Sequence, residues 1–147
     1  MERRKPMKRS PIKRAPKKRK PKTEKQRKKD RADDLFSKLV REPGYCFAFG
    51  WKHPDYPAVR CSEKGLQCAH IIGRASLVIR WNFLNAVPLC PGHHKWFTHE
   101  PDAWTAFIEE KYPGRKQRLK EIQRAERFDG DYDALLAYLT SLVPVAS

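Results

Sequence analysis

The chain has 147 residues, of which 39% are hydrophobic and 33% charged, so its hydrophobic core cannot be large. No apolar run approaches the roughly 20 residues that cross a bilayer, and the N-terminus lacks the apolar core of a signal peptide. We therefore expect no membrane partner and a cytoplasmic location. The net charge is +15, and residues 1–31, with 17 basic and 3 acidic residues, carry +14 of it. This asymmetry predicts a basic arm on a nearly neutral domain.

The predicted arm covers residues 1–24 and has a proline at every fifth position from Pro6 to Pro21. Proline interrupts helices and favours extended backbone, so we expect a disordered segment with polyproline II character. Its cations should bind DNA phosphates without sequence preference, whereas a solubilising tail or a nuclear localisation signal is the alternative. The candidate DNA-binding residues of the arm are Lys8, Arg9, Lys13, Arg14, Lys17, Lys18 and Arg19.

The rest of the chain predicts an α+β fold. Helix formers with spaced apolar residues predict a helix over 25–41, in a segment 25–43 that ends at Pro43-Gly44. Residues 44–65 lack a sustained period and predict an irregular loop. A strand over 66–72, a second strand over 86–89 and a helix beginning near Pro91 then predict a strand–loop–strand–helix unit inside a core of 44–104. Helices over 102–112, 115–128 and 132–142 complete a C-terminal helical scaffold, residues 105–147.

Four cysteines in a cytoplasmic protein are better explained as metal ligands or buried thiols than as disulfides. Cys90-x2-His93, at a turn that enters a helix, has the spacing of one half of a zinc knuckle. We predict a structural zinc held by these two residues together with Cys46 and Cys61. Cys68 competes with Cys61, although a lone cysteine on a strand is more typical of a buried thiol. The remaining alternative is that no zinc binds.

Three further residues form a candidate catalytic group. The imidazole of His70, with an ordinary pKa near 6.5, could act as general base for a water that attacks phosphorus. The amide oxygen of Asn85 could accept from an imidazole N–H or from the backbone and hold the loop. His94 lies roughly 100° around the helix from His93 and could hold a divalent cation, Mg²⁺, Mn²⁺, Ni²⁺ or Zn²⁺, that stabilises the charge on the phosphate. One base and one cation together fit phosphodiester hydrolysis.

Three segments carry a family resemblance: LQCAHIIGR over 66–74, RWNFLNAVPLC over 80–90 and HKWFTHEP over 94–101. With them, residues 44–104 resemble the phage branch of the HNH endonucleases and are similar to recombination proteins of the NinG type. The resemblance implies a ββα-metal fold, a structural zinc and a divalent-metal-dependent DNA nuclease. It also implies a phage-encoded protein that acts in the host cytoplasm in recombination, replication or packaging, with phage recombination or packaging proteins as partners.

The chain departs from that pattern at three positions. Ala69 stands where many relatives have an aspartate, so one expected ligand of the catalytic cation is absent, and we predict His99 as its substitute. His93 replaces the second cysteine of a Cys-x2-Cys pair, which zinc tolerates. Phe49 stands where the upstream pair would place its second sulfur.

Several side chains are candidates for contact with DNA. Arg74 and Arg80, in the loop between the strands, could each hold a phosphate with a forked guanidinium. Trp51, Trp81 and Trp96 could stack on bases, although core packing is the more typical role for Trp96. The main rival to a nuclease is a module that binds nucleic acid without cleaving it, and a smaller alternative is a structural partner in a phage replication or packaging complex.

Overall fold

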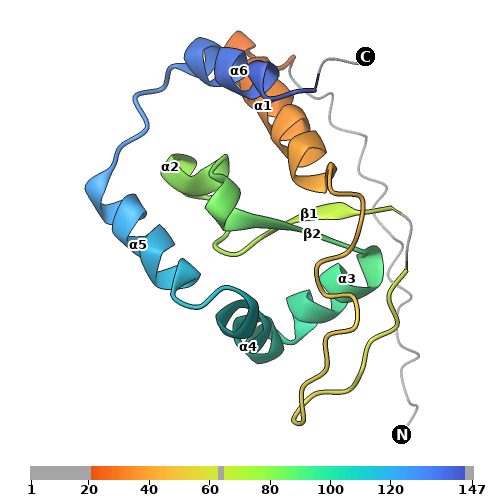
Figure 1. The fold of residues 1–147 in the computed structure, drawn as a ribbon. Helices are drawn as coiled ribbons and strands as arrows, with labels where there is room; N and C mark the ends of the chain where they lie inside the picture. Colours follow the sequence, from red (N-terminus) through yellow and green to blue (C-terminus); the bar gives the residue numbers. More distant parts are fainter. Residues whose placement is uncertain (1–20, 63–64, 145–147) are drawn as a thin grey trace, which may run out of the picture.

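A computed structural model of the chain describes residues 21–62 and 65–144. The DNA-binding candidates between residues 8 and 19, and with them most of the predicted arm, lie outside this part. The described residues form an α+β fold of six α-helices, one short 3-10 helix and a two-stranded antiparallel sheet (Figure 1). In chain order the elements are α1 (Glu24–Arg41), β1 (Gln67–His70), α2 (Leu77–Arg80), η1 (Phe83–Asn85), β2 (Ala86–Leu89), α3 (Pro91–His99), α4 (Pro101–Lys111), α5 (Arg115–Ala125) and α6 (Tyr132–Ser141).

Most predicted elements are confirmed, with shifts at their ends. Thr23 caps the start of α1 through a bond from the N–H of Gln26, which is why the helix begins just after the proline repeat. The first strand is shorter than predicted, because β1 ends at His70, where its pairing with β2 ends. The loop between the strands holds α2 and η1, which were not predicted. None of the described helices is long and apolar enough to span a membrane.

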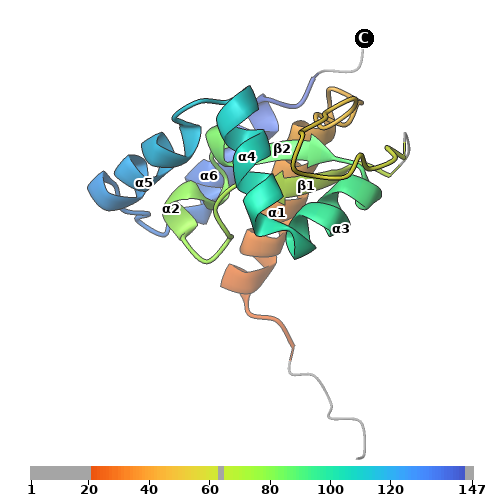
Figure 2. The ribbon, with the colours of Figure 1, turned by 90° about the horizontal axis from the view of Figure 1, so that it is seen from below.

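The hairpin lies in the middle of three layers. Helices α1 and α6 cover one face and α3 and α4 the other (Figure 1), and Figure 2 shows α4 in front of the hairpin when it is seen from below. Successive residues of β1 alternate between these faces: Cys68 packs with the cluster of α1 and α6, and Ala69 with the cluster of α3, α4 and α5. The two faces of one short strand therefore belong to two separate hydrophobic clusters.

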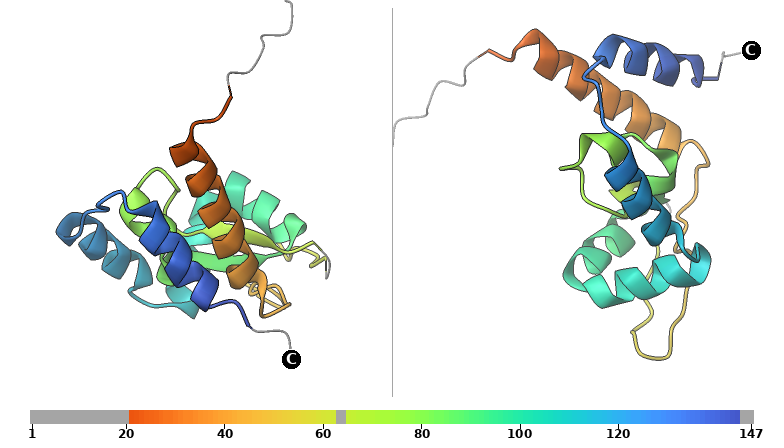
Figure 3. Two further views of the ribbon diagram at one scale, coloured as in Figure 1. Left: turned by 90° about the horizontal axis from the view of Figure 1, so that it is seen from above. Right: turned by 90° about the vertical axis from the view of Figure 1, so that its left-hand side faces the viewer.

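Helices α1 and α6 lie side by side over the hairpin (Figure 3), and Asp33 of α1 contacts the loop between the two strands. The Asp33 carboxylate accepts two bonds from the guanidinium of Arg80, at 2.8 and 2.6 Å, and one from the indole N–H of Trp81, at 2.9 Å. Trp81 is only 6% exposed and packs against Phe128 and Tyr132. This clamp fixes the loop between the strands on α1.

The clamp corrects part of the DNA-contact prediction. Arg80 is committed to an internal ion pair with Asp33, so its guanidinium is not free to hold a phosphate as we predicted. The tryptophans Trp51 and Trp81 are buried and cannot stack on a base without leaving the core. Trp96 is half-buried against Phe97, in line with core packing. Of the two predicted phosphate-binding arginines of the loop, only Arg74 stays exposed.

Candidate metal centre and histidine cavity

Three separate segments bring four metal-ligating side chains together. Cys46 follows α1, Cys61 precedes β1, and Cys90 and His93 lie at the start of α3. One ligand atom from each residue lies within 4.8 Å of the others, and among the described residues no other group of three or more His, Cys, Asp or Glu is so placed. The predicted quartet is therefore assembled, and this group could hold a metal ion.

The local structure at the start of α3 explains how two of these residues meet. Cys90 is the N-cap of α3, where its sulfur accepts from the N–H of His93, and Pro91 occupies the first helical position. Gly92 lets the segment with Cys61 approach, because a β-carbon at this position would lie 3.2 Å from the carbonyl oxygen of Arg60. Gly92 is thus a functional residue that the sequence reasoning missed, and its place inside the Cys-x2-His spacing was the available signal.

The distances within the quartet suit zinc. The Nδ1 atom of His93 lies 3.5 Å from the sulfur of Cys46 and 3.2 Å from that of Cys90. Tetrahedral bonds of about 2.3 Å to sulfur and about 2.0 Å to nitrogen set neighbouring ligand atoms about 3.5–3.8 Å apart. Three sulfurs and one imidazole are also a donor set that zinc prefers. The donor set and these distances therefore fit a zinc ion.

The surroundings of Cys61 and Cys90 shift the pKa values of their thiols in opposite directions. Burial raises the pKa of the Cys61 thiol to about 12, and hydrogen bonds with Cys90 and Cys46 act in the same direction. Burial also disfavours the Cys90 thiolate, but the N–H groups of His93 and Ser62 donate to its sulfur and lower its pKa to about 6. Because zinc binds thiolates, metal binding must release the proton held by Cys61.

Cys68, the alternative ligand, lies on the other side of the hairpin. It packs with α1 and α6, and burial raises the pKa of its thiol to about 11. The geometry therefore selects Cys61 over Cys68. Phe49, at the position of the missing sulfur, is 69% exposed beside the quartet.

His70 is held in one tautomer by the backbone. Its Nε2 atom lies 3.0 Å from the carbonyl oxygen of Arg80, which can only accept, so Nε2 carries the proton and Nδ1 keeps the electron pair. The ring lies 5.9 Å from that of Phe36 on α1. Burial lowers the pKa of His70, and the positive charges of Arg74 and Arg80 lower it further. His70 is therefore a neutral imidazole with Nδ1 able to accept a proton.

Asn85 holds the loop between the strands rather than an imidazole. Its amide oxygen accepts from the N–H of Ile72 at 2.7 Å, and its amide nitrogen donates to the carbonyls of Ile72 and Ile79 at 2.9 and 3.0 Å. The side chain is fully buried. Of the two roles considered for Asn85, the backbone role is the one that the structure shows.

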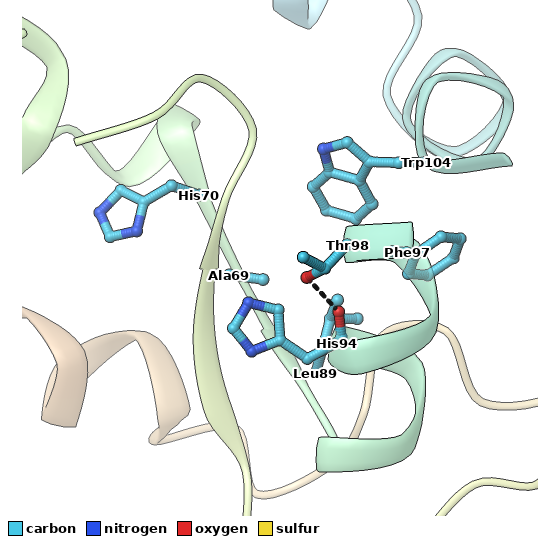
Figure 4. A pocket seen from close by; sticks show the side chains of 7 residues that line it. All are labelled: Ala69, His70, Leu89, His94, Phe97, Thr98 and Trp104. Atoms are coloured by element: carbon cyan, nitrogen blue, oxygen red, sulfur yellow. Dashed lines mark hydrogen bonds between the residues drawn. The ribbon is translucent and has the colours of Figure 1, made fainter. Parts of the chain in front are cut away.

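His94 lines a cavity of about 170 Å³ between β1 and α3 (Figure 4). Its Nδ1 atom lies 2.6 Å from the Oε1 atom of Gln67, and donation to that oxygen leaves Nε2 as an electron-pair donor for a cation. The lining residues include Thr98 and Trp104, to which the sequence reasoning gave no role in the site. The cavity is lined by Ala69, His70, Leu89, His94, Phe97, Thr98 and Trp104.

His70 and His94 reach this cavity from different sides. Figure 4 shows the two rings on either side of β1, with Ala69 between them. His99, the predicted second ligand of the cation, is exposed and does not line the cavity. It lies five positions after His94 in the chain, which turns it about 140° around the helix. The structure thus brings His70 and His94 to one cavity but not His99.

Comparisons of the chain with protein-family models, with curated proteins and with solved structures find no significant match. The chemistry of the site must therefore be argued from its own residues. These are a Cys₃His group at the start of α3, a neutral imidazole of fixed tautomer at His70, and a second imidazole at His94. Together they could hold one metal ion, accept one proton and offer one nitrogen donor to a further ligand.

Proposed function

We propose that the protein is a metal-dependent DNA endonuclease of the HNH type, in which β1, β2 and α3 form the ββα-metal unit. The observation that carries the proposal is the fixed tautomer of His70 beside the cavity that His94 lines. A neutral imidazole with one free nitrogen is what a general base for water requires. The resemblance of residues 44–104 to the phage branch of the HNH endonucleases supports the same function.

Each residue has a separate role in this proposal. Nδ1 of His70 removes the proton of the attacking water, and the Arg80 carbonyl stabilises the imidazolium that forms. Asn85 keeps the loop that carries this carbonyl in place. His94, whose ring is fixed by Gln67, would hold a divalent cation through Nε2. When bound, that cation neutralises charge on the phosphate and the leaving oxygen.

The position of the substrate follows from the placement of the two histidines. Because their rings lie on opposite sides of β1, a phosphodiester that reaches both must cross the His70 end of the strand (Figure 4). A zinc ion held by the Cys₃His group would fix the start of α3, and with it His94, against the hairpin. Its role would be structural, because the four protein ligands would leave no position open for water or substrate.

The biological setting rests on the resemblance and on charge. Residues 1–31 carry +14 and suit attraction to DNA phosphates. The resemblance to NinG-type proteins supports a phage protein of the bacterial cytoplasm that acts in recombination, replication or packaging with other phage proteins.

A second candidate is a zinc-containing module that binds nucleic acid without cleaving it. The observation that favours it is the cavity itself, where Ala69 offers no ligand and His99 does not line the wall. Among the described residues, His70 and His94 are then the only histidines that line the cavity, and no carboxylate lines it. Under this alternative, DNA binds tightly and no divalent cation produces cleavage.

Nicking of supercoiled plasmid by zinc-loaded protein separates the two candidates. We expect nicking with at least one of Mg²⁺, Mn²⁺, Ni²⁺ and Zn²⁺, and its loss in His94→Ala. His99→Ala, on the same helix, is the matched control and should nick like the wild type. Binding without cleavage in all four metals would reject the nuclease in favour of the binding module.

A further inference from the structure

A second cavity lies on the α1 side of β1, away from His94. It has a volume of about 200 Å³, room for several water molecules at about 30 Å³ each. Arg41, at the end of α1, and Arg74, in the loop after β1, both line it. His70 lines this cavity as well as the one shared with His94, so its imidazole stands between the two.

The charge of this second cavity is positive. Asp33 is its one acidic lining residue, and the ion pair with Arg80 at 2.6 Å neutralises it. Neither Arg41 nor Arg74 makes an ion pair with any residue in 21–62 or 65–144. Two guanidinium groups without a carboxylate partner therefore face one small cavity.

Arg41 is also held in position. Its Nε atom donates to the carbonyl of Ser37 at 2.9 Å, and one Nη atom donates to the carbonyl of Leu66 at 3.4 Å. Carbonyls orient a guanidinium without cancelling its charge, and of its five N–H groups three stay available. These two bonds restrict the rotation of the side chain before any ligand arrives, which lowers the entropic cost of binding.

We propose that Arg41 and Arg74 form a subsite for a backbone phosphate of DNA, next to the phosphate that His70 attacks. This inference rests on the proposed nuclease function and adds to it the path of the DNA backbone. The backbone would run from the His94 cavity, across the His70 end of β1, to the second cavity beside α1. Two forked guanidiniums recognise the oxygens of one phosphate without reading the base. Arg41 contributes from a helix 33 residues upstream of Arg74, outside the hairpin unit.

DNA binding by the full-length, zinc-loaded protein tests the subsite without any need for cleavage. Fluorescence anisotropy of a labelled duplex, with no added divalent cation, gives the dissociation constant as a function of NaCl. We expect Arg41→Gln and Arg74→Gln each to weaken binding about tenfold and to reduce the slope of log K against log salt by about 1. Arg124→Gln, an exposed arginine of α5 outside both the cavity and the basic segment 1–31, is the matched control for the change in charge.

The outcomes separate the subsite from the nuclease. Equal binding by Arg41→Gln, Arg74→Gln and Arg124→Gln would overturn the subsite, even if plasmid nicking is observed. A specific loss in the first two variants supports the subsite even if no metal yields cleavage, which would reject only the nuclease. If Arg41→Gln fails to retain zinc, Arg74→Gln decides, because its side chain makes no hydrogen bond to the described residues.

Discussion

Replacement of the buried Asn85 by alanine should destabilise the loop between the strands far more than replacement of Asn82 in the same loop. Asn85→Ala removes three hydrogen bonds, of 2.7, 2.9 and 3.0 Å, and leaves the N–H and the carbonyl of Ile72 without their partner, whereas the carbonyl of Ile79 keeps the N–H of Asn82. At about 1 kcal/mol for each bond, with an added penalty for buried groups left unpaired, the free energy of unfolding should fall by about 3–5 kcal/mol. Asn82→Ala loses one exposed cap bond, to the N–H of Leu84, and should cost about 1 kcal/mol.

Urea unfolding of zinc-loaded protein measures both losses, with an unchanged m-value as the sign that the same surface unfolds. The reasoning also predicts that Asn85→Ala lowers nicking activity, because the carbonyl that orients His70 belongs to the loop that Asn85 holds. An equal loss of stability in Asn85→Ala and Asn82→Ala would refute the role given to Asn85.

Three further predictions concern the metal sites and the base. Metal analysis should show that Cys61→Ser abolishes stoichiometric zinc binding and that Cys68→Ser leaves it intact. The reverse result would mean that Cys68, and not Cys61, is the zinc ligand. Since burial lowers the pKa of His70 and its neutral form is the base, kcat/KM should rise with pH along a limb centred below 6.5, and a midpoint above that value would contradict the assignment. Ala69→Asp, which adds a carboxylate beside His94, should tighten Mn²⁺ binding about tenfold or more in a nicking titration, whereas an unchanged Mn²⁺ requirement would place the cation elsewhere.

Features encoded by neighbouring residues were predictable from the sequence. The Cys90-x2-His93 spacing defines half of the metal group, and Pro91 between them marks the start of α3. Helix α1 follows from its apolar residues at helical spacing, whereas its cap at Thr23 emerged only from the structure. The preference for Cys61 over Cys68 as a metal ligand follows from the alternation of side chains along a strand, which places Cys68 on the face of β1 that α1 and α6 cover.

Features that depend on distant residues were not predictable. Asp33 lies 47 residues before Arg80 and 48 before Trp81 in the chain, and no local pattern predicts that it contacts them. These contacts are what make Arg80 and Trp81 unavailable to DNA. Helix α2 has only four residues, Leu77–Arg80, too few to show a helical period. The separation of His70 and His94 by β1 likewise depends on how the hairpin packs, which spacing along the chain does not reveal.

The nicking rate of His70→Ala tests the central claim most directly. The measurement is the conversion of supercoiled plasmid to nicked circles by zinc-loaded protein in the most active divalent metal. His53→Ala, a histidine of the loop before β1 that does not line the cavity, serves as the control. The proposed general base predicts a loss of about 100-fold or more in His70→Ala and none in His53→Ala. Nicking by His70→Ala at the wild-type rate would contradict the account.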